Sequence, residues 1–140
     1  MELDIKFDCS GVDWQAVSAT LKCVGMAYYE PAVHQKAFEN SYVTVFVYRG
    51  NRLVGFGRAI SDGAYQAAIY DVAIVPECQK QGIGTIIINN ILARLTQCNV
   101  ILYSSPGKEA FYRTLGFRSM KTGMALFRKA EAMQAKGFTE

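Results

Sequence analysis

The sequence holds few of the residues from which metal centres and disulfide frameworks are built. It has four cysteines and one histidine among 140 residues, and no two cysteines form a CxxC pair. A zinc site needs closely spaced Cys and His ligands, so we expect no metal. Scattered thiols favour a reducing compartment, and the N-terminal MELDIKF contains no apolar signal core. We therefore expect a cytoplasmic protein.

Long apolar runs and concentrated charge are also absent. No run approaches the ~18 apolar residues that cross a bilayer, so we expect no membrane partner. The basic residues are dispersed and the net charge is only +3, whereas a nucleic-acid surface needs a basic cluster. With 51% hydrophobic and 19% charged residues, the composition is typical of a globular domain.

Periodic patterns predict one mixed α/β domain. They indicate strands at 3–7, 41–49, 52–60, 65–75, 100–104 and 124–128, and helices at 13–25, 30–40, 83–97 and 108–117. In chain order this is strand, helix, helix, three strands, helix, strand, helix, strand. Gly50-Asn51 signals a tight hairpin turn, so the three central strands form an antiparallel meander. We expect a twisted, mixed, mostly antiparallel sheet flanked by helices, with the strand at 100–104 buried. The domain is predicted to cover 1–129, followed by a polar tail at 130–140.

Two smaller features of this pattern lead to expectations that a structure can check. Gly55 and Gly57 lie inside the middle strand of the meander, where glycine indicates a bulge or a close approach of another element. His34 is the one imidazole of the second helix, and we expect a surface residue rather than a catalyst.

The stretch QKQGIG, residues 79–84, joins a predicted strand to the N-terminus of a long helix. The first N–H groups of a helix have no internal partner and attract phosphate. Glycines allow a ligand to approach the backbone closely, and Lys80 adds a cation. The alternative is a polar turn that only packs.

Two other phosphate-binding motifs do not match this stretch. A Walker loop has Lys and Ser or Thr after its glycines, but Gly84 is followed by Thr85-Ile86. A dinucleotide fingerprint needs a third small residue where Ile87 stands, and it opens a βαβ unit rather than following an antiparallel meander.

Two motifs together resemble the GNAT superfamily of N-acetyltransferases. Gln79-Lys80-Gln81-Gly82-Ile83-Gly84, after Ile74-Val75-Pro76, resembles the acetyl-CoA signature Gln/Arg-x-x-Gly-x-Gly/Ala. FYRTLGF, residues 111–117, resembles the Phe-Tyr-x-x-x-Gly-Phe helix of that family. The segment SDGAYQAAIYDVAIVPECQKQGIG is also similar to plastid-type serotonin and protein-lysine acetyltransferases and to small bacterial relatives.

The resemblance implies an enzyme that uses acetyl-CoA to acetylate a primary amine, either a small amine or lysine, by direct attack on the thioester. It implies that the main chain at the strand end and in the turn holds the cosubstrate, through Ile74, Val75, Gln79, Lys80, Gln81, Gly82, Ile83, Gly84 and Thr85. It also allows a homodimer, since dimers are common in the family. The alternative is a non-catalytic acyl-CoA-binding regulatory module on the same fold.

The catalytic assignments are Tyr112 and Asp71. Tyr112 matches the tyrosine that the family places near the CoA sulfur, and a phenol is protonated at neutral pH, so it can donate to a thiolate. The alternative is an aromatic residue that only anchors its helix by packing. The strand glutamate of several family members is absent, because Ala68 and Tyr70 stand at its usual positions. Asp71 remains as a base, an ammonium anchor or a structural residue.

The predicted acceptor side comprises Asp62, Tyr65 and Tyr70. Asp62 lies in the turn before the third meander strand, where the alternative role is a capping contact. The two tyrosines belong to a tyrosine-rich set that is suited to an aromatic pocket for an arylalkylamine. Tyrosine is also a good strand residue, so ordinary packing is the alternative.

Overall fold

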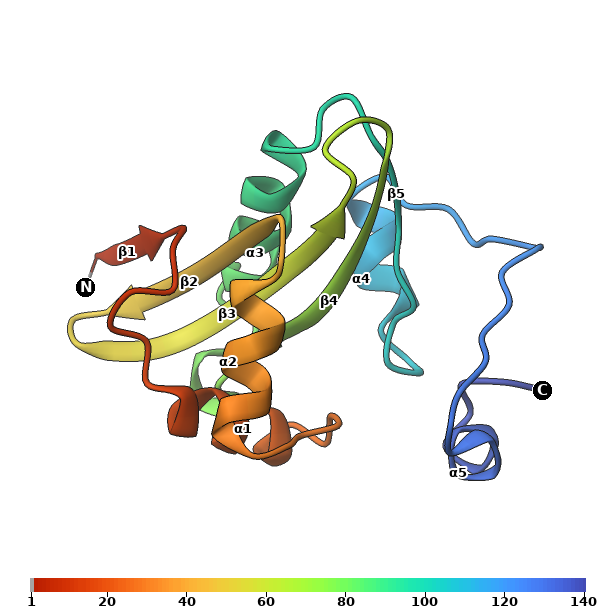
Figure 1. The fold of residues 1–140 in the computed structure, drawn as a ribbon, viewed down its shortest axis with the longest axis horizontal. Coiled ribbons are helices and arrows are strands. Elements are labelled where there is room, and N and C mark those ends of the chain that lie inside the picture. Colours follow the sequence, from red (N-terminus) through yellow and green to blue (C-terminus); the bar gives the residue numbers. More distant parts are fainter. Residues whose placement is uncertain (1) are drawn as a thin grey trace. The chain divides into compact units, whose positions relative to one another are not determined.

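The structure is a computed structural model that describes residues 2–140. The chain divides between Leu102 and Tyr103 into two compact units, whose folds are drawn in Figure 1. Among residues 2–140, no helix combines the length and the apolar character needed to cross a membrane. The domain boundary expected at residue 129 stays a prediction.

The first unit is built on a five-stranded sheet with the order β1-β2-β3-β4-β5. Every strand pair is antiparallel except β4–β5, which is parallel. The prediction of a mixed, mostly antiparallel sheet is therefore confirmed. The elements are β1 Leu3–Lys6, α1 Trp14–Cys23, α2 Pro31–Glu39, β2 Val43–Arg49, β3 Arg52–Ser61, β4 Gln66–Ile74, the 3₁₀ turn η1 Pro76–Cys78, α3 Ile83–Ala93 and β5 Asn99–Ile101.

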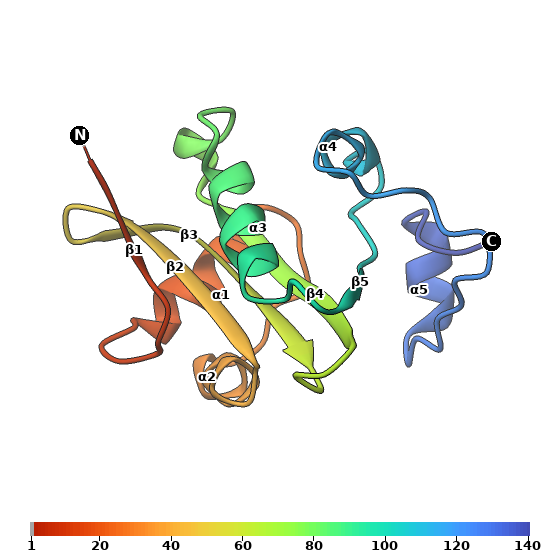
Figure 2. The ribbon, with the colours of Figure 1, turned by 90° about the horizontal axis from the view of Figure 1, so that it is seen from above.

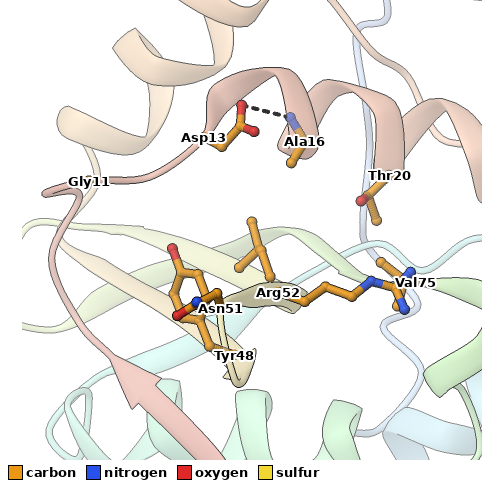
Figure 3. A pocket seen from close by; sticks show the side chains of 9 residues that line it. Gly11, Asp13, Ala16, Thr20, Tyr48, Asn51, Arg52 and Val75 are labelled. Carbon is orange, nitrogen blue, oxygen red and sulfur yellow. Dashed lines mark hydrogen bonds between the residues drawn. The ribbon is translucent and has the colours of Figure 1, made fainter.

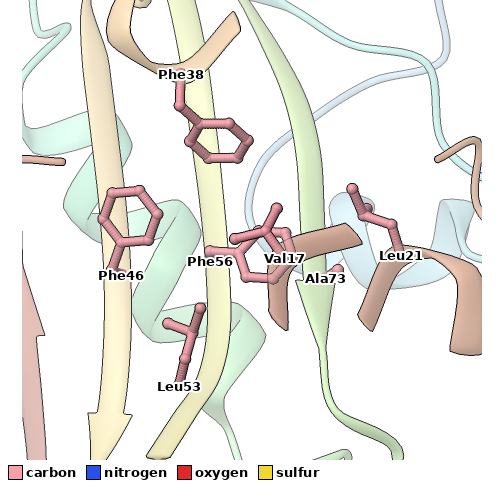
Figure 4. Packing of buried hydrophobic residues seen from close by; sticks show 7 residues of the cluster. All are labelled: Val17, Leu21, Phe38, Phe46, Leu53, Phe56 and Ala73. Atoms are coloured by element: carbon pink, nitrogen blue, oxygen red, sulfur yellow. The ribbon is translucent and has the colours of Figure 1, made fainter. Parts of the chain in front are cut away.

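Helices cover both faces of this sheet. Helices α1 and α2 lie on one face and α3 on the other (Figures 1 and 2). The core on the first face is a cluster of aliphatic and aromatic side chains drawn in Figure 4, made of Val17, Leu21, Phe38, Phe46, Leu53, Phe56 and Ala73. Burying such side chains stabilises each element by about 1.5–3 kcal/mol per residue, which fixes the helices on the sheet.

The opposite face requires glycines in β3, as the sequence indicated. A Cβ on Gly57 would lie 2.9 Å from Ile87 Cγ2, and a Cβ on Gly55 would lie 3.1 Å from Ile87 Cδ1. The apolar side of α3 therefore lies directly against the backbone of the middle strand. This contact fixes the position of α3, and with it the position of the preceding turn.

Local signals in the sequence correctly located several element ends. Asp13 caps α1, and its Oδ1 accepts from the Gln15 N–H at 3.0 Å. Pro31 opens α2, where a missing N–H costs nothing. Gly50 forms the β2–β3 turn with φ 62°. Each signal acts within a few residues, so it does not depend on the rest of the fold.

The second unit contains the helices α4, Glu109–Thr114, and α5, Ala130–Ala135. After α4, Gly116 takes φ 95° and the Phe117 N–H donates to the Tyr112 carbonyl at 3.1 Å, which is the expected glycine C-cap. The last strand predicted at 124–128 is wrong, because these residues form no strand. A strand needs a neighbour to pair with, and no strand is present among residues 103–140.

Two burial predictions also need correction. His34 was expected on the surface, but only 3% of it is exposed, and its Nε2 accepts the Tyr29 N–H at 2.9 Å. The helical period did not show that this position faces the sheet. The strand predicted at 100–104 was expected to be buried, yet β5 is short and has exposed residues at both ends.

Candidate active site

The glycine turn connects β4, through η1, to the N-terminus of α3. Gly82 is the residue before the first turn of α3 and has the left-handed φ of 83°, and no side chain caps this helix end among residues 2–140. A Cβ at Gly82 would meet no heavy atom within 4 Å, so the space in front of the helix is open. The arrangement fits a phosphate group, because exposed N–H groups and the helix dipole both attract an anion.

Side chains of the turn fold back onto its own backbone. Gln79 Nε2 donates to the Ile74 carbonyl at 3.1 Å, and Gln81 Nε2 donates to the Glu77 carbonyl at 3.3 Å. Lys80 has φ 62°, which is uncommon for a residue with a Cβ. The glutamines of the motif therefore shape the turn. The Gln79 N–H donates to the Pro76 carbonyl at 3.2 Å, so the main-chain N–H groups that remain for a ligand begin at Lys80.

The strand before the turn has an open edge within the first unit. β5 pairs with β4 only from Gln66 to Ala68. The Val75 N–H donates to the Val54 carbonyl at 2.9 Å, on the β3 side. Because successive N–H groups of a strand point in opposite directions, the Ile74 N–H points away from β3. Among residues 2–102, this edge beyond Ala68 is covered by no other strand.

Asp71 forms a bulge in the middle of β4. The register passes from Phe56↔Ala73 to Arg58↔Tyr70, so two residues of β4 oppose Gly57. Asp71 takes φ 58°, a left-handed conformation that Asp tolerates better than most residues. A bulge bends the strand and redirects a side chain, which explains why a carboxylate occurs in an otherwise apolar strand.

The Asp71 carboxylate is paired with Arg58. Arg58 Nε lies 2.7 Å from Asp71 Oδ2, and the two side chains are 14% and 23% exposed. Arg58 Nη1 also donates to Ser41 Oγ at 3.3 Å, and the guanidinium carbon lies 5.6 Å and 5.4 Å from the ring centroids of Phe38 and Tyr70. The carboxylate is therefore held in place by a neighbouring cation.

Sequence reasoning did not identify Arg58, although one signal was available. Arg58 and Asp71 are charged residues in adjacent, largely apolar strands, and half-buried charges are rarely left unpaired. Pairing them would have required the strand register, which the bulge shifts by one residue.

Asp62 has a turn-forming role in the structure. Its Oδ1 accepts the N–H groups of Ala64, Tyr65 and Gln66 at 2.8, 2.9 and 3.1 Å. These bonds lower the pKa of the carboxyl below its usual range, because they favour the charged form. Tyr65 follows with 64% exposure. The substrate-binding role of Asp62 and Tyr65 stays a prediction.

Tyr112 belongs to α4 in the second unit and is described within it. Its ring packs edge-on against Phe111 and Phe117, with centroids at 5.0 and 5.9 Å. Burial raises the pKa of the Tyr112 phenol, because it disfavours the phenolate. The phenol is thus a proton carrier at neutral pH. Asp71 lies in β4, and the glycine turn follows the end of that strand through η1. The placement of Tyr112 beside them stays a prediction.

A separate hollow of about 400 Å³ lies between α1 and the β2–β3 hairpin (Figure 3). Of the predicted site residues only Val75 lines it. The other lining residues are Gly11, Asp13, Ala16, Thr20, Tyr48, Asn51, Arg52 and Leu53. Neither Asp71 nor a residue of the QKQGIG turn lines it.

The chain is similar in sequence to known acetyltransferases. The family model of the acetyltransferase (GNAT) domain matches residues 13–125. The chain is 29% identical over 140 residues to serotonin N-acetyltransferase 2, chloroplastic, of Oryza sativa subsp. japonica, covering 93% of this chain and 70% of that protein. It is 30% identical over 119 residues to GCN5-related N-acetyltransferase 1, chloroplastic, of Arabidopsis thaliana, covering 81% of this chain and 60% of that protein.

Solved structures show the same fold. A GNAT-family acetyltransferase from Streptococcus pneumoniae superposes with a TM-score of 0.77 at 24% identity, covering 91% of this chain and 99% of that one. At this identity the likeness concerns the fold alone. The chain spans 40–70% of the length of the first curated relatives that it matches.

Proposed function

This chain belongs to the GNAT acetyltransferase family, and from that premise we propose that it transfers an acetyl group from acetyl-CoA to a primary amine. The plastid serotonin and GCN5-related N-acetyltransferases are among its relatives, in line with the narrower resemblance seen in the sequence. The observation that carries the proposal is the open N-terminus of α3, with the left-handed Gly82 in front of it.

The turn would hold the diphosphate of the cosubstrate. The main-chain N–H groups from Lys80 to Thr85 lie in the turn and the first residues of α3, where helix N–H groups lack internal partners. The predicted contact through the Gln79 N–H would require that group to leave the Pro76 carbonyl, to which it donates at 3.2 Å. Gly82 leaves room for close approach, and Lys80 adds a positive charge at the rim. When bound, acetyl-CoA supplies the activated acetyl group, and these residues position it.

The open edge of β4 would hold the pantetheine arm. The Ile74 N–H points away from β3 and is available to an extended ligand that lies beside the strand, as argued from the Val75 N–H bond to Val54. Val75 continues this edge toward the turn. An N–H group directed at the thioester carbonyl would also stabilise negative charge that develops on its oxygen.

Asp71 would anchor the substrate ammonium. Arg58 occupies Oδ2, and Oδ1 makes no hydrogen bond within residues 2–140, so it is available as an acceptor. Tyr70, next to Asp71, would form one wall of the acceptor pocket. The amine must lose a proton before it attacks the thioester, and in this proposal solvent accepts that proton while Asp71 anchors the amine.

Tyr112 would supply a proton to the leaving thiolate. Attack of the amine nitrogen forms the amide C–N bond and breaks the C–S bond, and the sulfur then accepts a proton. The raised pKa of Tyr112 keeps that proton on the phenol Oη at neutral pH, so the residue enters the reaction in its acid form.

The acceptor class follows from the relatives and the aromatic residues. The rice relative is named for serotonin, and Tyr65 and Tyr70 are suited to an aromatic amine. A lysine side chain is the other substrate proposed. We also propose a cytoplasmic location, a homodimer and no metal requirement.

The test combines binding with turnover. Acetyl-CoA is expected to raise the melting temperature of the wild type, and Gly82→Glu is expected to abolish that rise by placing a carboxylate at the phosphate position. Gly11→Glu is a matched control, because Gly11 has φ 70° and an equally open Cβ position but lies outside the turn. Wild type that millimolar acetyl-CoA does not stabilise would refute the proposal.

Turnover distinguishes the two functions left by the sequence. A CoA-release assay with tryptamine, serotonin, spermidine and a lysine peptide should give activity with at least one amine. Acyl-CoA binding without release across that panel would favour the non-catalytic module. That alternative has one feature in its favour, because the only carboxylate of β4 is already paired with Arg58.

A further inference from the structure

Arg49, the last residue of β2, reaches from the hairpin to the glycine turn. Its Nη2 donates to Gln81 Oε1 at 3.1 Å, and its Nη1 lies 3.6 Å from Cys78 Sγ. Its Nε is buried and has no hydrogen-bond partner among residues 2–140. The side chain thus connects the hairpin to the turn through the amide of Gln81.

The charge of Arg49 has no counter-ion within the described chain. Arg52 is paired with Glu77 and Arg58 with Asp71, whereas no carboxylate lies within 4 Å of the Arg49 guanidinium in residues 2–140. A half-buried charge without a partner is unfavourable. An anion bound at the turn would reduce this penalty, and a neutral ligand would not.

The turn also contains backbone strain that needs support. Lys80 and Gly82 both have positive φ, 62° and 83°, and Gln81 lies between them. A non-glycine residue in this region costs about 1 kcal/mol and persists only when its surroundings hold it. Gln81 is held at both ends of its amide, by Arg49 and by the Glu77 carbonyl.

We propose that Arg49 is a positioning residue for diphosphate binding. It fixes the Lys80–Gly82 backbone through Gln81, and its unpaired charge favours an anion in front of α3. The inference rests on the proposed function, because it assumes that the diphosphate of CoA binds at this turn. It predicts a defect that is specific to the diphosphate and leaves the acetyl-transfer step intact.

The test compares ligands with and without the diphosphate. Arg49→Met is expected to raise the Kd for CoA at least about tenfold, as for loss of a charged hydrogen bond, measured by calorimetry. Turnover at saturating acetyl-CoA should change less than about threefold, and so should kcat/KM with S-acetylpantetheine. Arg52→Met is the matched control, because Arg52 lies in the same hairpin and its ion pair with Glu77 is solvent-exposed. The Kd of this variant for CoA should change less than about threefold.

A double-mutant cycle tests the route through Gln81. If Arg49 acts through that amide, Arg49→Met and Gln81→Ala together should weaken CoA binding little more than the worse single variant. Additive losses would overturn the route. Arg49→Lys keeps the charge but not the paired donors, so it should recover part of the affinity. It also carries the test if thermal melting shows that Arg49→Met is unfolded.

The outcomes separate this inference from the proposed function. Wild type that does not bind CoA refutes the proposed function. Wild type that binds CoA while Arg49→Met binds it equally well overturns only the role of Arg49. An equal loss of CoA affinity and of S-acetylpantetheine turnover also overturns that role, because it shows general damage to the site.

Discussion

Asp71→Asn isolates the charge of the carboxylate at the bulge of β4. Asn has nearly the same shape, and it tolerates the left-handed φ of 58° about as well as Asp does. It can still accept the Arg58 Nε–H bond, which is 2.7 Å long in the wild type. The substitution therefore removes the negative charge and leaves the backbone and the packing unchanged.

The expected loss of stability is modest. A hydrogen bond to a charged group contributes about 1.5–3 kcal/mol, and a neutral one about 1 kcal/mol. Arg58 keeps its bond to Ser41 and its two aromatic neighbours. We expect the free energy of unfolding to fall by about 1–2 kcal/mol. Asp71→Ala should cost about 1 kcal/mol more, since Ala is disfavoured at positive φ.

The kinetic effect is expected mainly in the binding of the amine. If Oδ1 anchors the ammonium, Asp71→Asn raises KM for the amine about tenfold or more and lowers kcat less than tenfold. Urea denaturation measures the stability, and CoA release with varied amine measures the kinetics. Arg58→Met and the double variant complete a cycle that measures the coupling of the pair.

Two results would refute this reasoning. A fall in kcat of about a hundredfold or more at constant KM would identify Asp71 as the general base. Unchanged kinetics together with the loss of stability would identify a purely structural ion pair. Either result would remove Asp71 as the anchor of the substrate ammonium.

Three other substitutions test the fold and the chemistry. Gly57→Ala should lower the free energy of unfolding by about 1–2 kcal/mol, because its Cβ would lie 2.9 Å from Ile87 Cγ2. A free energy of unfolding in urea equal to that of the wild type would show that α3 shifts to accommodate the Cβ without a penalty. Burial lowers the pKa of His34 below its usual 6.5, so neutral His34 contributes fully to the free energy of unfolding above pH 6.5, and this contribution is lost as the pH falls through the folded pKa. His34→Gln should therefore make the free energy of unfolding in urea depend less on pH between 7.5 and 5. A pH dependence equal to that of the wild type would contradict this. Tyr112→Phe should lower turnover at least about tenfold with little change in acetyl-CoA affinity by calorimetry, and unchanged turnover would assign Tyr112 to packing.

Features that depend on a few consecutive residues were predicted correctly. The cap at Asp13, the hairpin turn at Gly50 and the glycine after α4 all agree with the structure. Such signals are readable because the hydrogen bonds involved join residues two to five positions apart. The order of the first nine predicted elements also agrees with the structure, because each periodic pattern is read within one segment.

Features that depend on which elements face each other were missed. The burial of His34 follows from the way α2 packs on the sheet. The pairing of Arg58 with Asp71 depends on a register shift between β3 and β4. The strand predicted at 124–128 has the right composition for a strand but no strand to pair with among residues 103–140.

The sequence by itself determined the glycine turn, because QKQGIG encodes both the positive φ of Gly82 and the start of α3 within six residues. Tertiary structure alone decided the environment of that turn and of Asp71. Arg49 reaches Gln81 across 32 positions, and Arg58 reaches Asp71 across 13. Contacts of this kind require the sheet to be assembled in one register, and no local pattern specifies that register.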